Sequence, residues 1–173
     1  MCREEYRERG DVGIGVSVAI CCHNSAHVLP ETLAHLKKQH GEPDLRWELM
    51  VIDNASEDDT TRAAHSHWKE NAPAPIRVLH EPRLSLCYAR ERPFEEARYE
   101  VVTFIDDDNW ISADWLKIVR EIMSGNPEVG AIGSTNRAIA DVTSPGWFSR
   151  YSEFYAAWAS AESPTIPKTV NGA

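Results

Sequence analysis

The chain of 173 residues carries 18 Lys and Arg against 27 Asp and Glu, a formal net charge of −9, and 42% of its residues are hydrophobic. This composition predicts one ordinary globular domain, and the acidic balance excludes a nucleic-acid partner, which would need a basic surface. No run of 18 apolar residues and no secretory signal occurs, so we expect a cytoplasmic protein without a membrane span.

Apolar runs alternate with amphipathic stretches in the first half of the chain. Strands are expected at 16–22, 48–52 and 76–79, with helices at 30–39 and 56–70 between them. Ser56 is expected to cap the second helix, with Asp59 three residues later. Residues 1–15 precede the first strand and are interpreted as an N-terminal extension of a domain that covers 16–173.

The alternation continues in the second half, with a helix at 84–98 that Pro93 should break or kink, and a strand at 101–105 buried on both faces. Ser112 is expected to cap a helix at 113–123, followed by a fifth strand at 129–133 and an aromatic helix at 147–158. Alternating strands and helices predict an α/β fold with a mostly parallel sheet flanked by helices.

Ligands of such sheets bind at the carboxyl ends of the strands, so the residues after each apolar run carry the functional information. Asp106, Asp107 and Asp108 follow the strand at 101–105 directly. Asp106 and Asp108 project to the same side of an extended backbone, and their hard oxygen atoms suit Mg²⁺ or Mn²⁺, which could bridge two phosphates. The alternative is an acidic turn that only supports the start of the following helix.

Asp53 follows the second strand and is expected to face the same crevice. Its carboxylate could accept a hydrogen bond from a uracil-like base or bind ribose hydroxyls, and the alternative is a turn leading to Ser56. His23 and Asn24 follow the first strand and could contact a nucleotide, although a lone histidine is more often a hydrogen-bonded structural residue.

Arg83 and Arg90 flank the start of the predicted helix at 84–98, and either could reach phosphate oxygens or remain a surface cation. The four cysteines lack the paired spacing of a zinc site, and we expect them to be reduced, partly buried thiols.

Three segments resemble, in order and spacing, the motifs of inverting family-2 glycosyltransferases: VSVAICCHNSAHVLPETLAHL, VIDNASEDDT and EPRLSLCYARERPFEEARYEVVTFIDDDNWISADWL. The resemblance covers roughly residues 16–173. The chain departs from the family's motifs at two places, Cys-Cys-His-Asn at 21–24 and Ala-Arg-Glu-Arg-Pro at 89–93. We expect both departures to reshape the pocket and to leave the metal site intact.

The resemblance implies a GT-A fold, similar to a Rossmann sheet, that binds a nucleotide-diphosphate sugar, with a UDP-sugar favoured, through Mn²⁺ or Mg²⁺. It implies that Asp53 contacts the base, that the main chain at Cys22–Asn24 lines the nucleotide pocket, and that Asp106 and Asp107 serve the ribose and the metal. Asp108 is implied as the best metal ligand. The implied reaction is transfer of a hexosyl group with inversion, through a carboxylate general base.

That general base and the acceptor side of the fold are expected beyond Ala173, since no matching carboxylate motif occurs within the chain. Two alternatives therefore stay open: a non-catalytic module that binds a nucleotide sugar, and a nucleotidyltransferase, which would need a glycine-rich basic loop after the first strand. The donor sugar and the acceptor stay open. So does the choice between a monomer and a homodimer formed through the aromatic residues at 147–158.

Overall fold

The computed structural model describes residues 14–40, 44–134, 143 and 145–151. The chain divides into two compact units, Met1–Glu128 and Val129–Ala173. The described helices and strands of the first unit are β1 (Val16–Cys22), α1 (Leu29–Leu36), β2 (Trp47–Asp53), α2 (Thr60–Trp68), β3 (Ile76–His80), α3 (Leu86–Glu96), β4 (Val101–Asp106) and α4 (Trp115–Gly125). The second unit contains the short helix α5 (Phe148–Tyr151).

The four strands form one parallel sheet in the order β3-β2-β1-β4, so β1 is paired on both sides. Every apolar residue of β1 except Cys21 is fully buried or nearly so, which explains the run of small and β-branched side chains in this strand. The parallel α/β arrangement predicted from the sequence is confirmed.

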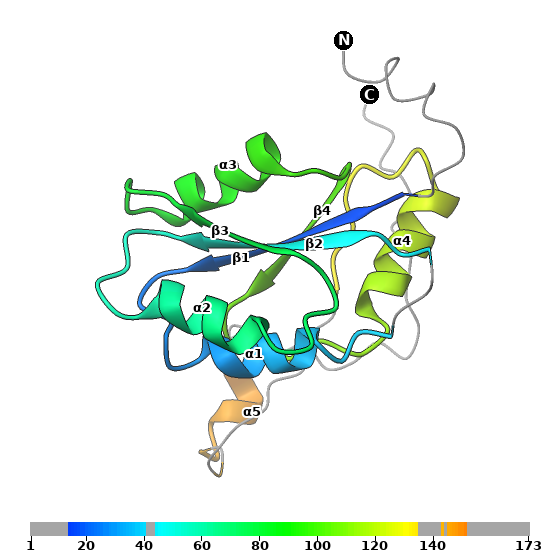
Figure 1. The fold of residues 1–173 in the computed structure, drawn as a ribbon. Helices are drawn as coiled ribbons and strands as arrows, with labels where there is room; N and C mark the ends of the chain where they lie inside the picture. Colours follow the sequence, from blue (N-terminus) through cyan, green and yellow to red (C-terminus); the bar gives the residue numbers. More distant parts are fainter. Residues whose placement is uncertain (1–13, 41–43, 135–142, 144, 152–173) are drawn as a thin grey trace. The chain divides into compact units, whose positions relative to one another are not determined.

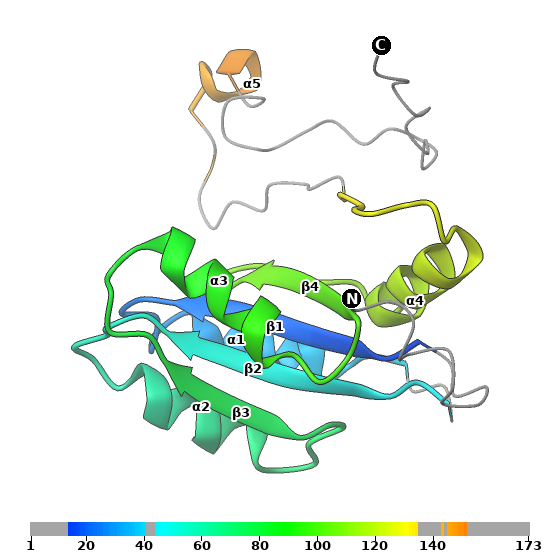
Figure 2. The same cartoon turned by 90° about the horizontal axis from the view of Figure 1, so that it is seen from above.

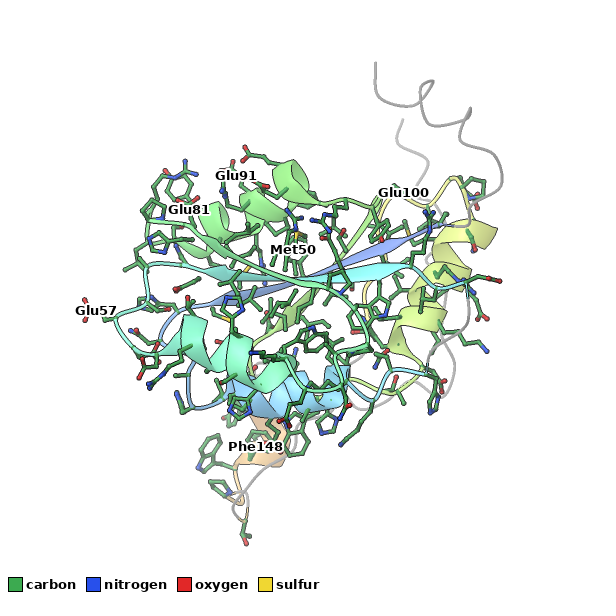
Figure 3. The ribbon with its side chains drawn as sticks, viewed as in Figure 1. Met50, Glu57, Glu81, Glu91, Glu100 and Phe148 are labelled. Atoms are coloured by element: carbon green, nitrogen blue, oxygen red, sulfur yellow. The ribbon has the colours of Figure 1, made fainter. Side chains whose placement is uncertain are left out.

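Helices cover both faces of the sheet (Figures 1 and 2). On one face, α1, α2 and α4 pack against alternate residues of β1, β2 and β4 around Leu33, Trp68 and Leu116. On the other face, α3 packs through Ala89 against the smaller cluster formed by Ala19, Met50 and Ile52. Figure 3 shows Met50 between the sheet and α3.

Both predicted helix caps are wrong. Helix α2 begins at Thr60 rather than near Ser56, and the Ser56 hydroxyl accepts a hydrogen bond from the Asn24 N–H instead (3.0 Å). Helix α4 begins at Trp115, and its first turn is capped by a residue far away in the sequence: the Gln39 Oε1 atom accepts a hydrogen bond from the Leu116 N–H (3.0 Å). At α4 a tertiary contact thus takes the role that local spacing assigned to Ser112, whereas at the start of α2 the Thr60 N–H donates to the nearby Asp58 carboxylate (3.0 Å).

Helix α3 continues through Pro93 to Glu96, and the proline ring is buried. Pro93 therefore does not break the helix, and a kink at this residue stays a prediction. Burial of that ring offsets the lost backbone hydrogen bond. Two other expectations were wrong. Residues 129–133, predicted as a fifth strand, form no strand and are largely exposed. Strand β4 was expected to be buried on both faces, but its residues alternate between buried and partly buried because it lies at the edge of the described sheet. Of the predicted helix at 147–158, only α5 lies within the described residues.

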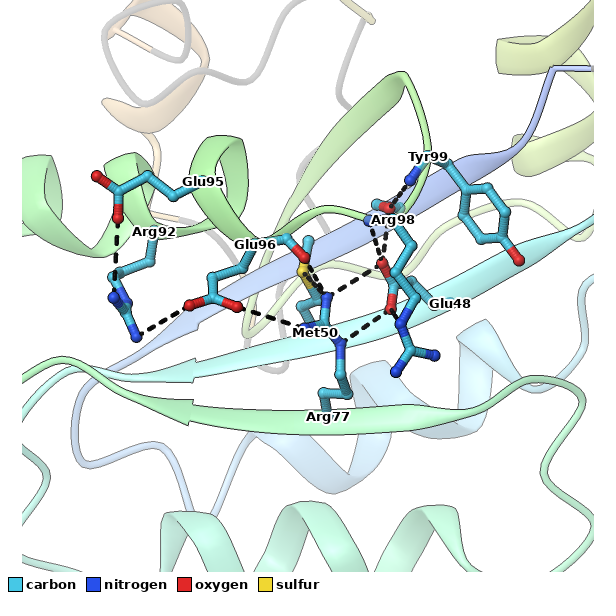
Figure 4. A network of polar contacts seen from close by, with 9 residues as sticks. Glu48, Met50, Arg77, Arg92, Glu95, Glu96, Arg98 and Tyr99 are labelled. Carbon is cyan, nitrogen blue, oxygen red and sulfur yellow. Dashed lines mark hydrogen bonds and ion pairs between the residues drawn. The ribbon is translucent and has the colours of Figure 1, made fainter. Parts of the chain in front are cut away.

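Glu48 of β2 is the centre of a polar network beneath α3 (Figure 4). Its side chain is 1% exposed and accepts hydrogen bonds from the Ser17 hydroxyl (2.9 Å), the Arg77 guanidinium (3.0 Å) and the Arg98 N–H (2.8 Å). Burial alone would raise the pKa of Glu48, but these three donors outweigh it and lower the pKa below its ordinary value. The network therefore joins three strands to the loop between α3 and β4 through a charged carboxylate.

Among the described residues, no helix is long and apolar enough to span a membrane.

We predict that replacing Gln39 by Leu destabilises the protein by about 2 kcal/mol. The substitution places an apolar side chain of similar size in a site that is 8% exposed, but it removes the cap of α4 and the donor to the Ser112 carbonyl (2.7 Å). Urea unfolding measures the change, and Lys38→Leu at the exposed neighbouring position is the control. A loss below about 0.5 kcal/mol for Gln39→Leu would contradict the assigned cap.

The lowered pKa of Glu48 predicts how its contribution to stability depends on pH. The contribution is present above the ordinary pKa of 4.5 and is lost as the pH falls through the lower folded-state pKa. Glu48→Gln should therefore cost about 2 to 4 kcal/mol at pH 7, and the difference from the wild type should shrink below about pH 5.

Urea unfolding across that pH range tests the Glu48 prediction, with Glu91→Gln on the exposed surface of α3 as the control. A difference between the wild type and Glu48→Gln that stays constant from pH 7 to pH 3 would contradict the lowered pKa, because it would mean that folding leaves the pKa of Glu48 unchanged.

Candidate functional site

The carboxyl ends of the strands meet at one edge of the sheet. In the register, Cys22 of β1 lies opposite Asp53 of β2, and Cys21 lies opposite Asp106 of β4. Asp53 and Asp106 are therefore separated by one strand, which corresponds to about 10 Å between their backbones. The expectation that the two aspartates share one edge is met by the topology.

Asp53 is almost buried, at 8% exposure, and its carboxylate is fixed by two donors. The Ser56 N–H donates to Oδ1 (3.1 Å) and the Thr61 hydroxyl donates to Oδ2 (2.7 Å). Each carboxylate oxygen has a second lone pair, so Asp53 can still accept a hydrogen bond from a ligand at either oxygen. Its orientation is set before any ligand arrives.

The loops after β1 and β2 are bound to each other. The Glu57 N–H donates to the Asn24 side-chain oxygen (2.8 Å), and the Ala26 N–H donates to the Asp58 carboxylate (3.0 Å). Asn24 and Ala55 adopt left-handed backbone conformations, with φ of 54° and 53°. Asn24 thus uses its side-chain oxygen and its N–H to hold the second loop, and a nucleotide contact by this residue stays a prediction.

His23 is held by its own neighbours. Its Nδ1 atom lies 2.8 Å from the Asn54 carbonyl oxygen, which can only accept, so Nδ1 carries the proton. Nε2 then accepts from the Asn24 side-chain amide at 3.2 Å. This bonding matches the structural alternative weighed for His23 in the sequence.

Asn54 organises the segment that leads into α3. Its side-chain amide donates to the Glu81 and Arg83 carbonyls (3.0 and 2.8 Å), and its side-chain oxygen accepts from the Ser85 N–H (3.0 Å). Asn54 was missed in the sequence, where only the preceding Asp53 stood out as a candidate. Its position directly after a buried strand was the signal that could have identified it.

Arg83 is already paired. Its guanidinium donates to the Glu81 carboxylate (2.8 and 3.1 Å) and lies over the Tyr88 ring, 4.0 Å from its centroid. The hydrogen bonds from the Arg83 side chain, together with the one from its N–H, lower the pKa of Glu81 to about 2. A phosphate ligand would have to compete with a nearly buried carboxylate for Arg83, and that contact stays a prediction.

The acidic turn, Asp106–Asp108, follows β4 and is closed by a hydrogen bond from the Asn109 N–H to the Asp106 carbonyl (3.2 Å). Asp106 is well exposed and lies 3.6 Å from the Arg90 guanidinium. Asp108 is exposed and has no hydrogen-bond or ion-pair partner among the described residues. The described part of the chain has no group of three His, Cys, Asp or Glu side chains arranged to hold a metal ion.

A cavity of about 240 Å³ opens between the end of β1 and the start of α3. Its walls are mainly apolar, and its lining residues are Cys21, Cys22, His23, Asn54, Leu84, Ser85, Leu86 and Ala89. Two of these, Leu84 and Leu86, are more than half exposed. The cavity therefore lies where Asn54 and the end of β1 meet the start of α3.

The two cysteines in the cavity wall are protonated at neutral pH. Burial raises the pKa of Cys21 to about 11, and burial together with the negative charge of Asp107 raises the pKa of Cys22 further. Free, partly buried thiols were expected, and Cys21 and Cys22 agree with this, whereas Cys87 is exposed. Cys2 lies outside the described residues.

Comparison with known proteins identifies the family. The chain matches the family model described as glycosyl transferase family 2 over residues 17–170. The chain belongs to glycosyltransferase family 2. The resemblance drawn from the sequence motifs is confirmed. This family-2 chain is 26% identical to the succinoglycan biosynthesis protein ExoM of Rhizobium meliloti over 150 residues, which are 85% of the chain and 47% of ExoM. The chain thus spans about half the length of this curated relative.

Solved structures confirm the GT-A fold of this family-2 chain. S. aureus TarS 1–349 in complex with UDP superposes with a TM-score of 0.58 at 22% identity, over 66% of this chain and 33% of that one. The mannosyltransferase PcManGT from Pyrobaculum calidifontis, in complex with GDP-Man and Mn²⁺, gives 0.55 at 22% identity, over 64% and 32%. At this identity the likeness concerns the fold alone.

We predict that Cys21 and Cys22 react far more slowly with a thiol reagent than Cys87 does. With its pKa at about 11, only about one in a thousand Cys21 side chains is a thiolate at pH 8, and both side chains are shielded. In a Cys2→Ser background, titration with Ellman's reagent should show one fast thiol, which Cys87→Ser removes. Two or three fast thiols would contradict the burial of the cavity wall.

Proposed function

We propose that this chain binds the donor of a sugar transfer, a nucleotide-diphosphate sugar, through the edge formed by Asp53 and the acidic turn. The observation that carries the proposal is the pairing of a fixed, nearly buried carboxylate with two exposed carboxylates across the central strand. The base would lie against Asp53 and the cavity beside Cys22 and His23. The diphosphate would extend towards Asp106 and Asp108.

We infer that the base is uracil. The carboxylate of Asp53 accepts a hydrogen bond from the N–H of a uracil ring, whereas the matching nitrogen of cytosine has no proton to donate. Guanine and thymine also offer an N–H, so the binding experiment below compares UDP with GDP and dTDP. Among the solved relatives, TarS is in complex with UDP and PcManGT with GDP-Man, which supports a nucleoside diphosphate without choosing the base.

A divalent cation fits the residues of the acidic turn. Mg²⁺ and Mn²⁺ sites in such proteins use one or two carboxylates and complete their coordination with phosphate oxygens and water. The exposed carboxylates of Asp106 and Asp108 supply that number of ligands, and Asp108 is free of competing partners among the described residues. When bound, the cation would neutralise the charge on the departing diphosphate. The Mn²⁺ in the PcManGT complex supports this choice of metal.

Arg90 is a candidate for a second contact with the diphosphate. Its guanidinium is 48% exposed and lies 3.6 Å from Asp106, a separation longer than a hydrogen bond. If the cation takes Asp106, the neighbouring guanidinium can turn to a phosphate oxygen with little rearrangement. Arg90 fits this role better than Arg83, which is bound to Glu81.

Because the chain spans 47% of ExoM, sugar transfer with inversion, the carboxylate general base and the acceptor are proposals for the whole protein. A cytoplasmic location and a homodimer through the residues at 147–158 also stay predictions. Most of that aromatic segment lies outside the described residues.

We predict that the chain binds UDP more tightly than GDP, CDP or dTDP, and that without Mn²⁺ or Mg²⁺ only a small residual affinity for UDP remains. Isothermal titration with each diphosphate, with and without metal, measures this. Asp108→Ala should lower the affinity for UDP at least about tenfold in the presence of metal, because it removes a metal ligand.

Asp44→Ala, a change of the same kind in an exposed turn, serves as the matched control and should bind like the wild type. Equal binding of UDP by the wild type and Asp108→Ala, or no binding of any diphosphate, would contradict the proposed site.

A further inference from the structure

Helix α1 lies along the segment that follows β4. The His35 ring stacks on the Trp110 ring, with centroids 5.3 Å apart and planes 4° from parallel. Beyond the end of α1, the Gln39 side-chain amide donates to the Ser112 carbonyl (2.7 Å), and the His40 N–H donates to the Ala113 carbonyl (2.8 Å). The segment after the acidic turn is thus fastened to α1 at successive points.

The acidic turn itself is held at its middle residue. The Thr32 hydroxyl of α1 donates to the Asp107 carbonyl oxygen at 2.7 Å. The Ser25 hydroxyl, in the loop before α1, donates to the Asp107 carboxylate. Thr32 is fully buried and Ser25 is 1% exposed, so both donors approach Asp107 from the protein side.

This arrangement gives the three aspartates different surroundings. Asp107 is only partly exposed, and both its backbone carbonyl and its side chain are bonded to the protein. Asp106 and Asp108, on either side of it, are exposed. The middle residue is therefore oriented inwards, while its two neighbours keep their carboxylates available to solvent.

We propose that Asp107 binds neither the cation nor the nucleotide and instead, held by Thr32 and Ser25, is a positioning residue that directs Asp106 and Asp108 towards the ligand. Thr32 is a positioning residue in the same sense, because it acts on the turn and has no exposed surface of its own. This inference rests on the proposed function and replaces the ligand contact that the resemblance implied for Asp107.

The first test compares two matched variants, Asp107→Asn and Asp108→Asn, in the full chain with UDP present. The asparagine oxygen at 107 can still accept from the Ser25 hydroxyl, so Mn²⁺ affinity, followed by electron paramagnetic resonance, should fall less than about threefold. Asp108→Asn removes a ligand and should lower it at least about tenfold. Equal losses in the two variants would overturn the proposal, because they would make Asp107 a ligand.

The second test removes the donor to the Asp107 carbonyl. Thr32→Val replaces the hydroxyl by a methyl group of similar size and should weaken Mn²⁺ binding at least about tenfold, as loss of a supporting contact does at metal sites. Thr32→Ser keeps a hydroxyl and should restore binding. Thr103→Val, in the buried strand that leads to the turn, is the control, since its hydroxyl makes no hydrogen bond to the turn among the described residues.

Two further measurements separate positioning from general structure: the thermal midpoint, and the small residual affinity for UDP without metal. Thr32→Val should leave both close to the wild-type values. Wild-type Mn²⁺ affinity in Thr32→Val would overturn the proposal, and so would equal losses of metal binding and metal-free UDP binding. Failure of the wild type to bind Mn²⁺ or UDP at all would instead reject the proposed function, and the inference with it.

Discussion

The parallel pairing of β1 with both β2 and β4 is the constraint on which the rest of the structure depends. Because β1 is buried between its neighbours, a slip of one residue would turn its core side chains to the opposite face. The register is therefore fixed, and it determines which residues emerge together at the carboxyl edge. Cys22, Asp53 and Asp106 are neighbours there because their strands end level with one another.

Once the register is fixed, the loops at that edge stabilise one another. The loop after β1 is bonded to the loop after β2 through Asn24, and to the acidic turn through Ser25. The Glu48 network acts at a different place, beneath α3, where it ties β1, β2 and β3 to the approach to β4. The site is thus supported by contacts between segments that lie far apart in the sequence.

The sequence predicted the parts of the fold that depend on local pattern. Apolar runs identified the four strands, and the polar residues after them, Asp53 and Asp106–Asp108, marked the edge because parallel strands end on the same side. Helix starts were predicted less well. Ser56 and Ser112 have the right local spacing for caps, but Asn24 and Gln39 make contacts there that no local rule contains.

The supporting residues of the site were beyond sequence reasoning for the same reason. Thr32 looks like an ordinary helical residue, and its partner Asp107 is 75 positions away. Gln39 and Leu116 are 77 positions apart. Nothing in the spacing of polar residues shows which of them will meet once the helices pack on the sheet. Similarly, the sequence offered Arg83 and Arg90 equally as phosphate-binding residues. The structure distinguishes them, because Arg83 is paired with the nearly buried Glu81 whereas Arg90 lies beside Asp106.

The most direct test of the central claim is a crystal structure of the chain with UDP and Mn²⁺, with anomalous data collected at the manganese edge. We expect one strong anomalous peak coordinated by Asp108 and the diphosphate. The uracil ring should be hydrogen-bonded to Asp53, and Asp107 should still be turned towards Ser25. Well-ordered UDP with its manganese peak away from the acidic turn, or with its base away from Asp53, would contradict the account.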